Sequence, residues 1–348
     1  MATIDPSYQL LACQYLRKQL DALIKEVRGV RENQDIEPVH QARVASRRLR
    51  AALGMFDDCF ESKKVDKWRK RIRKVTKGLG AARDLDVQIQ FLEQFLAHLD
   101  AAGKRHRPGV ERLVLRLRQN RAAVQPKVVK ALDALEKGNA MAQMHGELEK
   151  AHFLLRHRAV SVQSPYAFER TAAHIRDRVQ TLLAHEQTLA DPSDAPGHHQ
   201  LRIDAKRLRY TMEICDPVYD GQLGPVIKAV KKAQTLLGDI HDCDVWAQDV
   251  ESFTDEERLR TIAYFGHDGP FSPLKPGLQL LLDERRRCRA EIFDRAVEHW
   301  TALNEDHLWE TLDAVLRSPV AVAAQPDVET KDPTTNGPQE DTDDNSPD

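Results

Sequence analysis

The sequence contains few of the features from which β-sheets, disulfide frameworks and membrane spans are built. Aromatic residues make up only 6% of its 348 positions, and no alternating β-branched run closes on an Asn-Gly or Asp-Gly turn, so strands are not expected. The five cysteines are odd in number and never in Cys-x-x-Cys spacing, which indicates neither a disulfide framework nor a zinc site. No apolar run approaches the roughly 18 residues of a membrane span, and the N-terminus lacks the pattern of a secretion signal. We therefore expect a soluble cytoplasmic protein.

Acidic charge is concentrated at the C-terminal end of the sequence. The formal net charge is -2, but positions 325–348 hold eight acidic residues and a single basic one, Lys331, so the rest of the chain is net positive. This end is also rich in Pro, Thr, Asn and Gly, a composition typical of disorder. We expect a disordered acidic tail over residues 319–348, which either keeps the protein soluble or folds back to compete with an anionic ligand.

Apolar residues recur at three- and four-residue steps along most of the chain, which predicts an all-α fold. Leu16, Leu20, Leu23 and Val27 illustrate the pattern. Comparable segments are 39–60, 66–79, 85–99, 110–135, 138–159, 166–189, 198–215, 223–237, 245–265 and 278–316. Residues 266–277 contain three prolines and three glycines and are expected to form a loop.

Two motifs occur twice, in the same order. The segment His-Gln-Ala-Arg-Val-Ala-Ser-Arg-Arg-Leu-Arg at 40–50 returns as His-Gln-Leu-Arg-Ile-Asp-Ala-Lys-Arg-Leu-Arg at 199–209. A Leu-Gly-x-x-x-Asp-x-Asp motif follows each copy, at 79–86 and at 237–244. Nearly constant spacing of two matched motifs predicts an internal repeat. We expect two pseudo-symmetric helical bundles, residues 1–160 and 161–318, around a basic central groove.

Helical geometry places the cations of each repeat on one face. At about 100° per residue, four residues of the first motif share one arc, opposite Leu49 and Leu53, and we call them the first stripe: His40, Arg43, Arg47 and Arg50. Their counterparts form the second stripe: His199, Arg202, Lys206 and Arg209. The following helices add a first basic face of Lys70, Arg73, Lys74 and Lys77, and a second of Lys228, Lys231 and Lys232. Thr235 replaces the fourth cation of the second face.

Such one-sign faces indicate binding of an extended anion. Solvated helix faces usually mix signs, because opposite charges at i, i+4 support a helix and like charges weaken it. Arginine is well suited to bidentate recognition of phosphate oxygens. Arg48 and Arg207 lie off the stripes and are expected to pair with carboxylates of their own half. Some arginines of the run 285–289 are expected to extend the groove.

The histidines and the Asp-x-Asp motifs leave alternatives open. His40 and His199 either cap or pack, or donate hydrogen bonds to phosphate. Gly80 and Gly238 are typical helix C-caps, with Asp84 and Asp242 as N-caps of a following helix. Asp86 and Asp244 would complement a helix N-terminus or hold neighbouring arginines. With no nucleophile–base pair and no Gly-rich phosphate loop, we expect no catalysis, no cofactor and no metal.

The repeated His-x-x-Arg-x-x-x-[Arg/Lys]-Arg-x-Arg segments and Asp-x-Asp motifs resemble the CHAD family (conserved histidine α-helical domain) over roughly residues 7–318. The resemblance implies two helical bundles around a basic channel, binding of inorganic polyphosphate through the stripes and basic faces, and location at polyphosphate granules. Some members carry a triphosphate tunnel metalloenzyme domain ahead of this module, and none is expected here. The competing hypotheses are nucleic-acid binding and a metal-dependent phosphohydrolase that uses the Asp-x-Asp motifs. Oligomeric state is not predicted.

Overall fold

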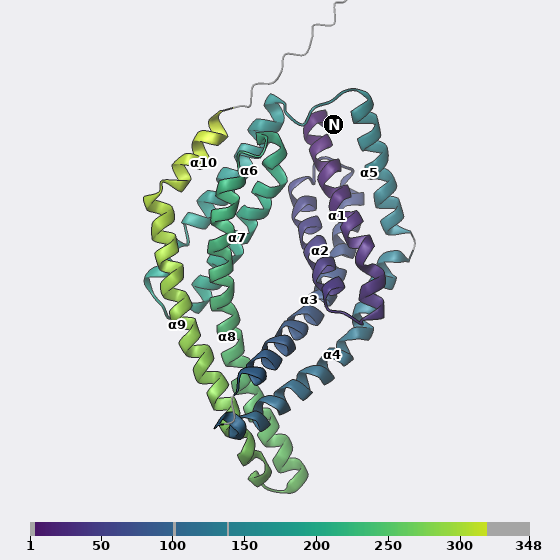
Figure 1. Ribbon diagram of the computed structural model, residues 1–348. Coiled ribbons are helices and arrows are strands. Elements are labelled where there is room, and N and C mark those ends of the chain that lie inside the picture. Colours follow the sequence, from purple (N-terminus) through teal and green to yellow (C-terminus); the bar gives the residue numbers. More distant parts are fainter. Residues whose placement is uncertain (1–3, 100–101, 138, 319–348) are drawn as a thin grey trace, which may run out of the picture.

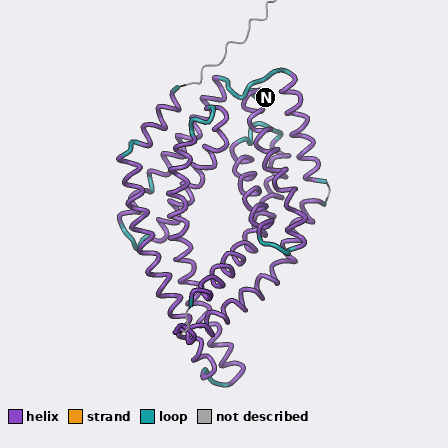
Figure 2. Tube along the Cα trace, in the orientation of Figure 1, coloured by secondary structure: helices purple, strands orange, loops and turns teal. Residues whose placement is uncertain are grey.

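The computed structural model describes residues 4–99, 102–137 and 139–318, and in these ranges the chain forms helices and connecting loops without a strand (Figures 1 and 2). The all-α prediction is therefore confirmed. The predicted acidic tail, 319–348, lies outside the described residues. None of the described helices is both long enough and apolar enough to cross a bilayer.

Ten α-helices and four short 3₁₀ helices make up the described chain. The first five α-helices are α1 (Pro6–Glu32), α2 (Glu37–Met55), α3 (Ser62–His98), α4 (Arg107–Glu136) and α5 (Ala140–His157). The other five are α6 (Pro165–Leu183), α7 (Ala195–Cys215), α8 (Gly224–Phe265), α9 (Lys275–Glu305) and α10 (Leu308–Arg317). The 3₁₀ helices are η1 (Ala102–His106), η2 (Glu186–Ala190), η3 (Asp216–Tyr219) and η4 (Gly269–Leu274).

Local sequence signals explain where several helices begin. The Asp5 carboxylate accepts the backbone N–H groups of Ser7 and Tyr8 at the start of α1, and Ser164 and Asp194 cap α6 and α7 through their side chains. Each of these helices also has proline in its first turn, where the missing N–H costs nothing. The cap and the proline together set the N-terminus.

The predicted interruptions at Gly80 and Gly238 are wrong, because both positions lie inside the long continuous helices α3 and α8. Among the described glycines only Gly221 and Gly266 have a positive φ, so neither Gly80 nor Gly238 ends a helix in the left-handed conformation. Glycine inside a helix costs about 1 kcal/mol relative to alanine, which tertiary packing offsets here. Conversely, the segment predicted as one helix over 278–316 is divided between α9 and α10.

The helices α1–α5 form one set and the helices α6–α10 a second, and the two sets contact each other at both ends of the molecule. One large core lies among α1, α2, α5, α6, α7 and the adjoining parts of α3, α4, α8, α9 and α10, with α2 against α7 and α1 against α6. A second, separate core lies where the end of α3 and the start of α4 meet α8, η4 and α9 (Figure 1). Its members include Leu92, Val110, Trp246, Phe253 and Leu281. We call this second contact region the lower joint.

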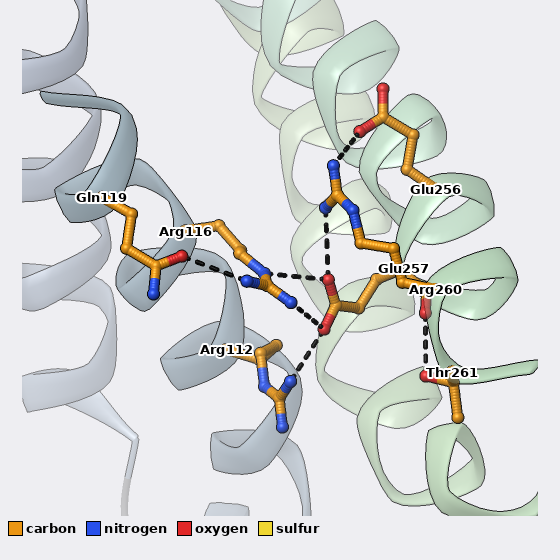
Figure 3. A network of polar contacts seen from close by, with 7 residues as sticks. All are labelled: Arg112, Arg116, Gln119, Glu256, Glu257, Arg260 and Thr261. Atoms are coloured by element: carbon orange, nitrogen blue, oxygen red, sulfur yellow. Dashed lines mark hydrogen bonds and ion pairs between the residues drawn. The ribbon is translucent and has the colours of Figure 1, made fainter. Parts of the chain in front are cut away.

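A buried carboxylate strengthens the lower joint. Glu257 of α8 is only 2% exposed and accepts from Arg112 at 2.8 Å, from Arg116 at 3.0 and 3.1 Å and from Arg260 at 3.3 Å (Figure 3). Arg112 and Arg116 belong to α4, so this network joins the two sets of helices. Burial alone would raise the pKa of Glu257, but hydrogen bonds and charge from the three arginines outweigh it and hold the pKa below its ordinary value.

Candidate functional site

The two stripes approach each other across the contact between α2 and α7. Each helix buries its apolar side, with Leu49 and Leu201 fully inaccessible, so the opposite sides carry the cations. Lys206 of α7 is close enough to Arg47 of α2 for their charges to repel, and burial together with this repulsion lowers the pKa of Lys206 to about 8. Cations 159 positions apart in the sequence are therefore neighbours.

Arg47 and Arg202 form the centre of this cationic cluster. Burial lowers the pKa of each guanidinium, and each also feels the positive charge of the other half: Arg47 that of Arg209, and Arg202 that of Arg47. Neither arginine forms an ion pair within the described ranges, and the Nε of Arg202 is buried without a hydrogen-bond partner. The charges of Asp242 and Asp84 offset part of this repulsion without a direct ion pair, and a bound anion would supply the contacts that the two guanidinium groups lack.

Two aspartates lie at the edge of the cluster. Asp84 of α3 forms an ion pair of 3.3 Å with Arg43. Burial raises the pKa of Asp242 on α8, the Arg202 charge lowers it, and the negative charges of Asp239 and Asp84 raise it further. Asp84 and Asp242 therefore approach each other from the two halves, among the arginines of the stripes. Their predicted role as N-caps is wrong, since both stand in the middle of a helix.

The second aspartate of each Asp-x-Asp motif holds an arginine of the next long helix. Asp86 pairs with Arg121 of α4 at 2.6 Å, and Asp244 pairs with Arg289 of α9 at 2.5 Å. The Asp86–Arg121 pair is buried, with side chains 5% and 10% exposed. Of the two roles expected for these aspartates, the arginine-holding one is confirmed.

The stripe histidines have equivalent neighbours in the two halves. Burial lowers the pKa of His40, and the nearby charge of Arg83 lowers it further. His199 lies 3.0 Å from His241, Nδ1 to Nδ1, with ring centroids 4.2 Å apart. Burial and the Arg202 charge lower the pKa of both His199 and His241, that of His241 to about 4. A pair of neutral imidazoles can share one proton between these nitrogens, whereas a doubly protonated pair cannot.

Arg83 and His241 were missed by the sequence reasoning as members of the site. They occupy equivalent positions in the repeat, each directly before the first aspartate of its motif. The assumed interruption of the helix concealed them, because an uninterrupted α3 or α8 carries the basic face onward to these residues.

The cations of the two basic faces are exposed side chains of α3 and α8. Lys70, Arg73, Lys74 and Lys77 on α3 are all exposed, as are Lys228, Lys231 and Lys232 on α8. Burial lowers the pKa of Arg50, and the charges of Arg73 and Arg47 lower it further, so the first stripe is continuous with the first basic face. In the second half, burial lowers the pKa of His299 on α9, a hydrogen bond with the Ala229 carbonyl opposes this, and the nearby charge of Lys232 lowers the pKa further.

Arg209 and Arg48 both form ion pairs with Glu213, which neither was predicted to do. Arg209 is 9% exposed, ion-pairs with Glu213, bonds to Gln234 at 2.7 Å and stacks on the Tyr210 ring. Its charge is therefore neutralised internally, which corrects the expectation of a free cation. Arg48 also pairs with Glu213, at 3.2 Å and across the halves, so the expected partner within its own half is wrong.

Two further expectations concern arginines away from the stripes. Arg207 pairs with Asp204 of its own half at 3.2 Å, as predicted. The run 285–289 does not add unpaired cations, because each arginine of the run has an acidic partner: Glu284, Glu251, Glu291 and Asp244 in order.

In the parts of the chain that the structure describes, no three His, Cys, Asp or Glu side chains lie together in a way that could hold a metal ion.

Comparison with known proteins identifies the family. The CHAD domain matches residues 14–251. Two uncharacterized proteins of Mycobacterium tuberculosis, MT2285 of strain CDC 1551 and Rv2226 of strain H37Rv, are each 27% identical over 239 residues, which is 65% of this chain and 42% of theirs. The chain thus spans less than half the length of these relatives.

Solved structures share the fold. The CHAD domain from the plant Ricinus communis aligns with a TM-score of 0.58 and 21% identity, over 90% of this chain and 92% of that one. PptA from Streptomyces chartreusis aligns with a TM-score of 0.58 and 17% identity, over 85% of this chain and all of that one. These likenesses show the fold, and the sequence match covers more than half of the chain. The protein therefore belongs to the CHAD domain family.

Proposed function

We propose that this protein binds inorganic polyphosphate, without catalysis, in a groove between the first and second stripes and the two basic faces. The observation that carries the proposal is the proximity of Arg47 and Arg202, which approach from different halves and form no ion pair within the described residues. Their repulsion is retained in the folded chain, and a bound anion would relieve it.

The expected ligand is a polymer because single contacts are weak. An exposed charge contact contributes about 1 kcal/mol or less, so a monomeric anion that makes two or three contacts binds poorly. About ten such contacts to one chain, together with counterion release, reach micromolar affinity or better. Polyphosphate has the charge density and the length to engage several helices at once.

The proposed ligand residues are those of the sequence prediction, with one reassignment. Arg209 is committed to Glu213, so we assign it a structural role and add Arg83 and His241, which stand beside the stripe histidines. The two repeats, 1–160 and 161–318, are proposed to contribute one wall each. Location at polyphosphate granules in the cytoplasm would follow from such binding.

Titration calorimetry with polyphosphates of graded length, at two salt concentrations, tests the proposal. We expect affinity to rise with chain length and to fall steeply with salt. The double variant Arg47→Gln/Arg202→Gln should bind at least tenfold more weakly, with unchanged helicity. The matched control Arg28→Gln/Arg118→Gln removes two cations paired with Glu32 and Glu93 elsewhere and should bind normally. Equal affinities for the two double variants would remove the site assignment.

The same titration separates the competing hypotheses. Nucleic-acid binding predicts that single-stranded RNA or DNA displaces polyphosphate, yet Trp68 and Tyr210, the aromatic residues within the basic segments, are 6% and 8% exposed and offer no free stacking surface. A phosphohydrolase predicts phosphate release with magnesium or manganese. Its Asp-x-Asp carboxylates would have to act while Asp86 and Asp244 hold arginines.

A further inference from the structure

Lys206 stands at the position that Arg47 occupies in the first half, and a lysine, unlike an arginine, can react as a neutral amine near pH 7. The amine is half-buried on α7 and forms no ion pair within the described chain. Cations and imidazoles face it from three helices: Arg43 and Arg47 of α2, His199, Arg202 and Arg207 of α7, and His241 of α8. A lysine surrounded in this way has the setting of a nucleophilic amine.

The neighbours favour the uncharged form of this amine. Burial, then repulsion by Arg47, Arg202 and Arg43, lowers the pKa of Lys206 from 10.5 to about 8. At pH 7 about a tenth of the amine is then neutral, roughly 300-fold more than for an unperturbed lysine. The neutral amine is the form that attacks a carbonyl carbon.

The same neighbours provide a binding place for a phosphoryl group. Guanidinium groups bind phosphate oxygens in a planar, bidentate manner, and Arg202 has a buried Nε with no partner. An electrophile that carries a phosphate would therefore be held next to the amine. Small acyl phosphates combine a phosphoryl group with an activated carbonyl in one molecule.

We propose that Lys206 is a modification site that small acyl phosphates, such as acetyl phosphate, acylate without a separate enzyme. The neutral Nζ attacks the carbonyl carbon, and a C–N bond forms as the bond between that carbon and the phosphate oxygen breaks. Inorganic phosphate leaves with the electron pair, and the proton lost from nitrogen passes to it. The products are Nε-acyl-lysine and phosphate.

Acylation would remove one positive charge from the centre of the cluster. If polyphosphate binds there, as the proposed function holds, the modified protein binds it more weakly, and bound polyphosphate shields Lys206 from reaction. This consequence rests on the proposed function, whereas the acylation itself does not. The two can therefore fail separately.

Site-resolved mass spectrometry of the full-length protein during incubation with acetyl phosphate at pH 7.5 tests the proposal. We expect the rate constant for Lys206 to exceed those of Lys228 and Lys231, two exposed lysines of α8, at least tenfold. N-hydroxysuccinimide acetate, which carries no phosphate, should give a smaller preference. A Lys206 rate with acetyl phosphate equal to or below the two references would overturn the proposal.

A variant distinguishes the anion-binding contribution. Arg202→Gln should slow acylation of Lys206 by acetyl phosphate more than by the phosphate-free reagent. Equal slowing with both reagents would overturn the claim that the cluster binds the acyl phosphate. Polyphosphate affinity of the unmodified protein, measured in parallel, shows whether a missing shielding effect reflects failure of the proposed function instead.

Discussion

Removal of the Asp84 charge should tighten polyphosphate binding, although the change lies inside the proposed site. Asp84 is the acid that holds Arg43, at 3.3 Å, and its side chain is 66% exposed. An ion pair with this exposure contributes only about 0.2–1 kcal/mol. In Asp84→Asn the Arg43 guanidinium is free to contact a phosphate, and a negative charge that would repel the polymer is gone.

The expected gain is about 1 kcal/mol in binding free energy, which corresponds to roughly fivefold higher affinity. One additional phosphate contact should also steepen the dependence of log affinity on log salt by about 0.7–0.9. Because Asp84 offsets repulsion within the cluster, the variant should lose up to about 1 kcal/mol of folding stability in the absence of ligand. Affinity and stability therefore change in opposite directions.

Calorimetric titration at two salt concentrations, together with urea denaturation, measures both effects. Glu32→Gln is the matched control, because it removes an acid paired with Arg28 on α1, outside the stripes, and should leave affinity unchanged. Weaker binding by Asp84→Asn, or an unchanged affinity and salt slope, would refute the reasoning. A metal-dependent phosphohydrolase that used Asp84 would instead lose phosphate release in this variant.

Three further predictions concern stability. Glu257→Gln should cost about 1.5–3 kcal/mol in urea denaturation, because it removes the buried carboxylate that accepts from three partly exposed arginines of the lower joint; an unchanged free energy of unfolding would show that the network does not stabilise this joint. Arg121→Ala should cost about 3–5 kcal/mol at neutral pH by leaving the Asp86 carboxylate buried without its partner; a loss below about 1 kcal/mol would contradict this. The lowered pKa of His241, about 4 in the folded chain, means that the unfolded chain binds more protons between about pH 6.5 and 4, so stability should fall as pH falls through this window, and less so in His241→Asn; identical pH profiles for the two proteins would be evidence against the lowered pKa.

The sequence was sufficient to predict the helical class and the buried apolar sides of the helices that carry the stripes. Helical periodicity is a local property, and the apolar sides of the helices are buried as expected, with Leu49 and Leu208 fully inaccessible. The matched motifs also indicated that the two stripes belong to equivalent helices. What the sequence could not show is the distance between them, because the contact of α2 with α7 is a property of the tertiary structure.

The interrupted helices were predicted from a signal that tertiary structure overrides. A glycine followed by an aspartate is typical of a cap and a new start, yet α3 and α8 continue through both motifs. Helical spacing, continued through the glycine, predicts the face of α3 on which Asp84 lies. Asp84 follows Lys77 by seven residues and Arg73 by eleven, which places it on the same face as these cations. Close packing does not require the glycine at position 80, since an added Cβ would stand 3.7 Å from the Arg43 Nε, an ordinary van der Waals contact.

The ion pair of Arg209 could have been predicted from the sequence, whereas that of Arg48 could not. Glu213 follows Arg209 by four residues, the spacing at which helical ion pairs form. The pairing of the same carboxylate with Arg48 joins residues 165 positions apart and follows only from the packing of the two halves.

The two halves contribute different kinds of charge to the cluster. Where the first half places Arg47 and Arg83, the second places Lys206 and His241 at the equivalent positions. Arginine keeps its proton throughout the physiological range, whereas burial and nearby cations lower the pKa of Lys206 to about 8 and that of His241 to about 4. At these two positions the first half therefore supplies fixed charge, whereas the second half supplies charge that changes with pH. If a polyanion binds the cluster as proposed, it favours the protonated forms of Lys206 and His241, so its binding would draw protons onto the second half.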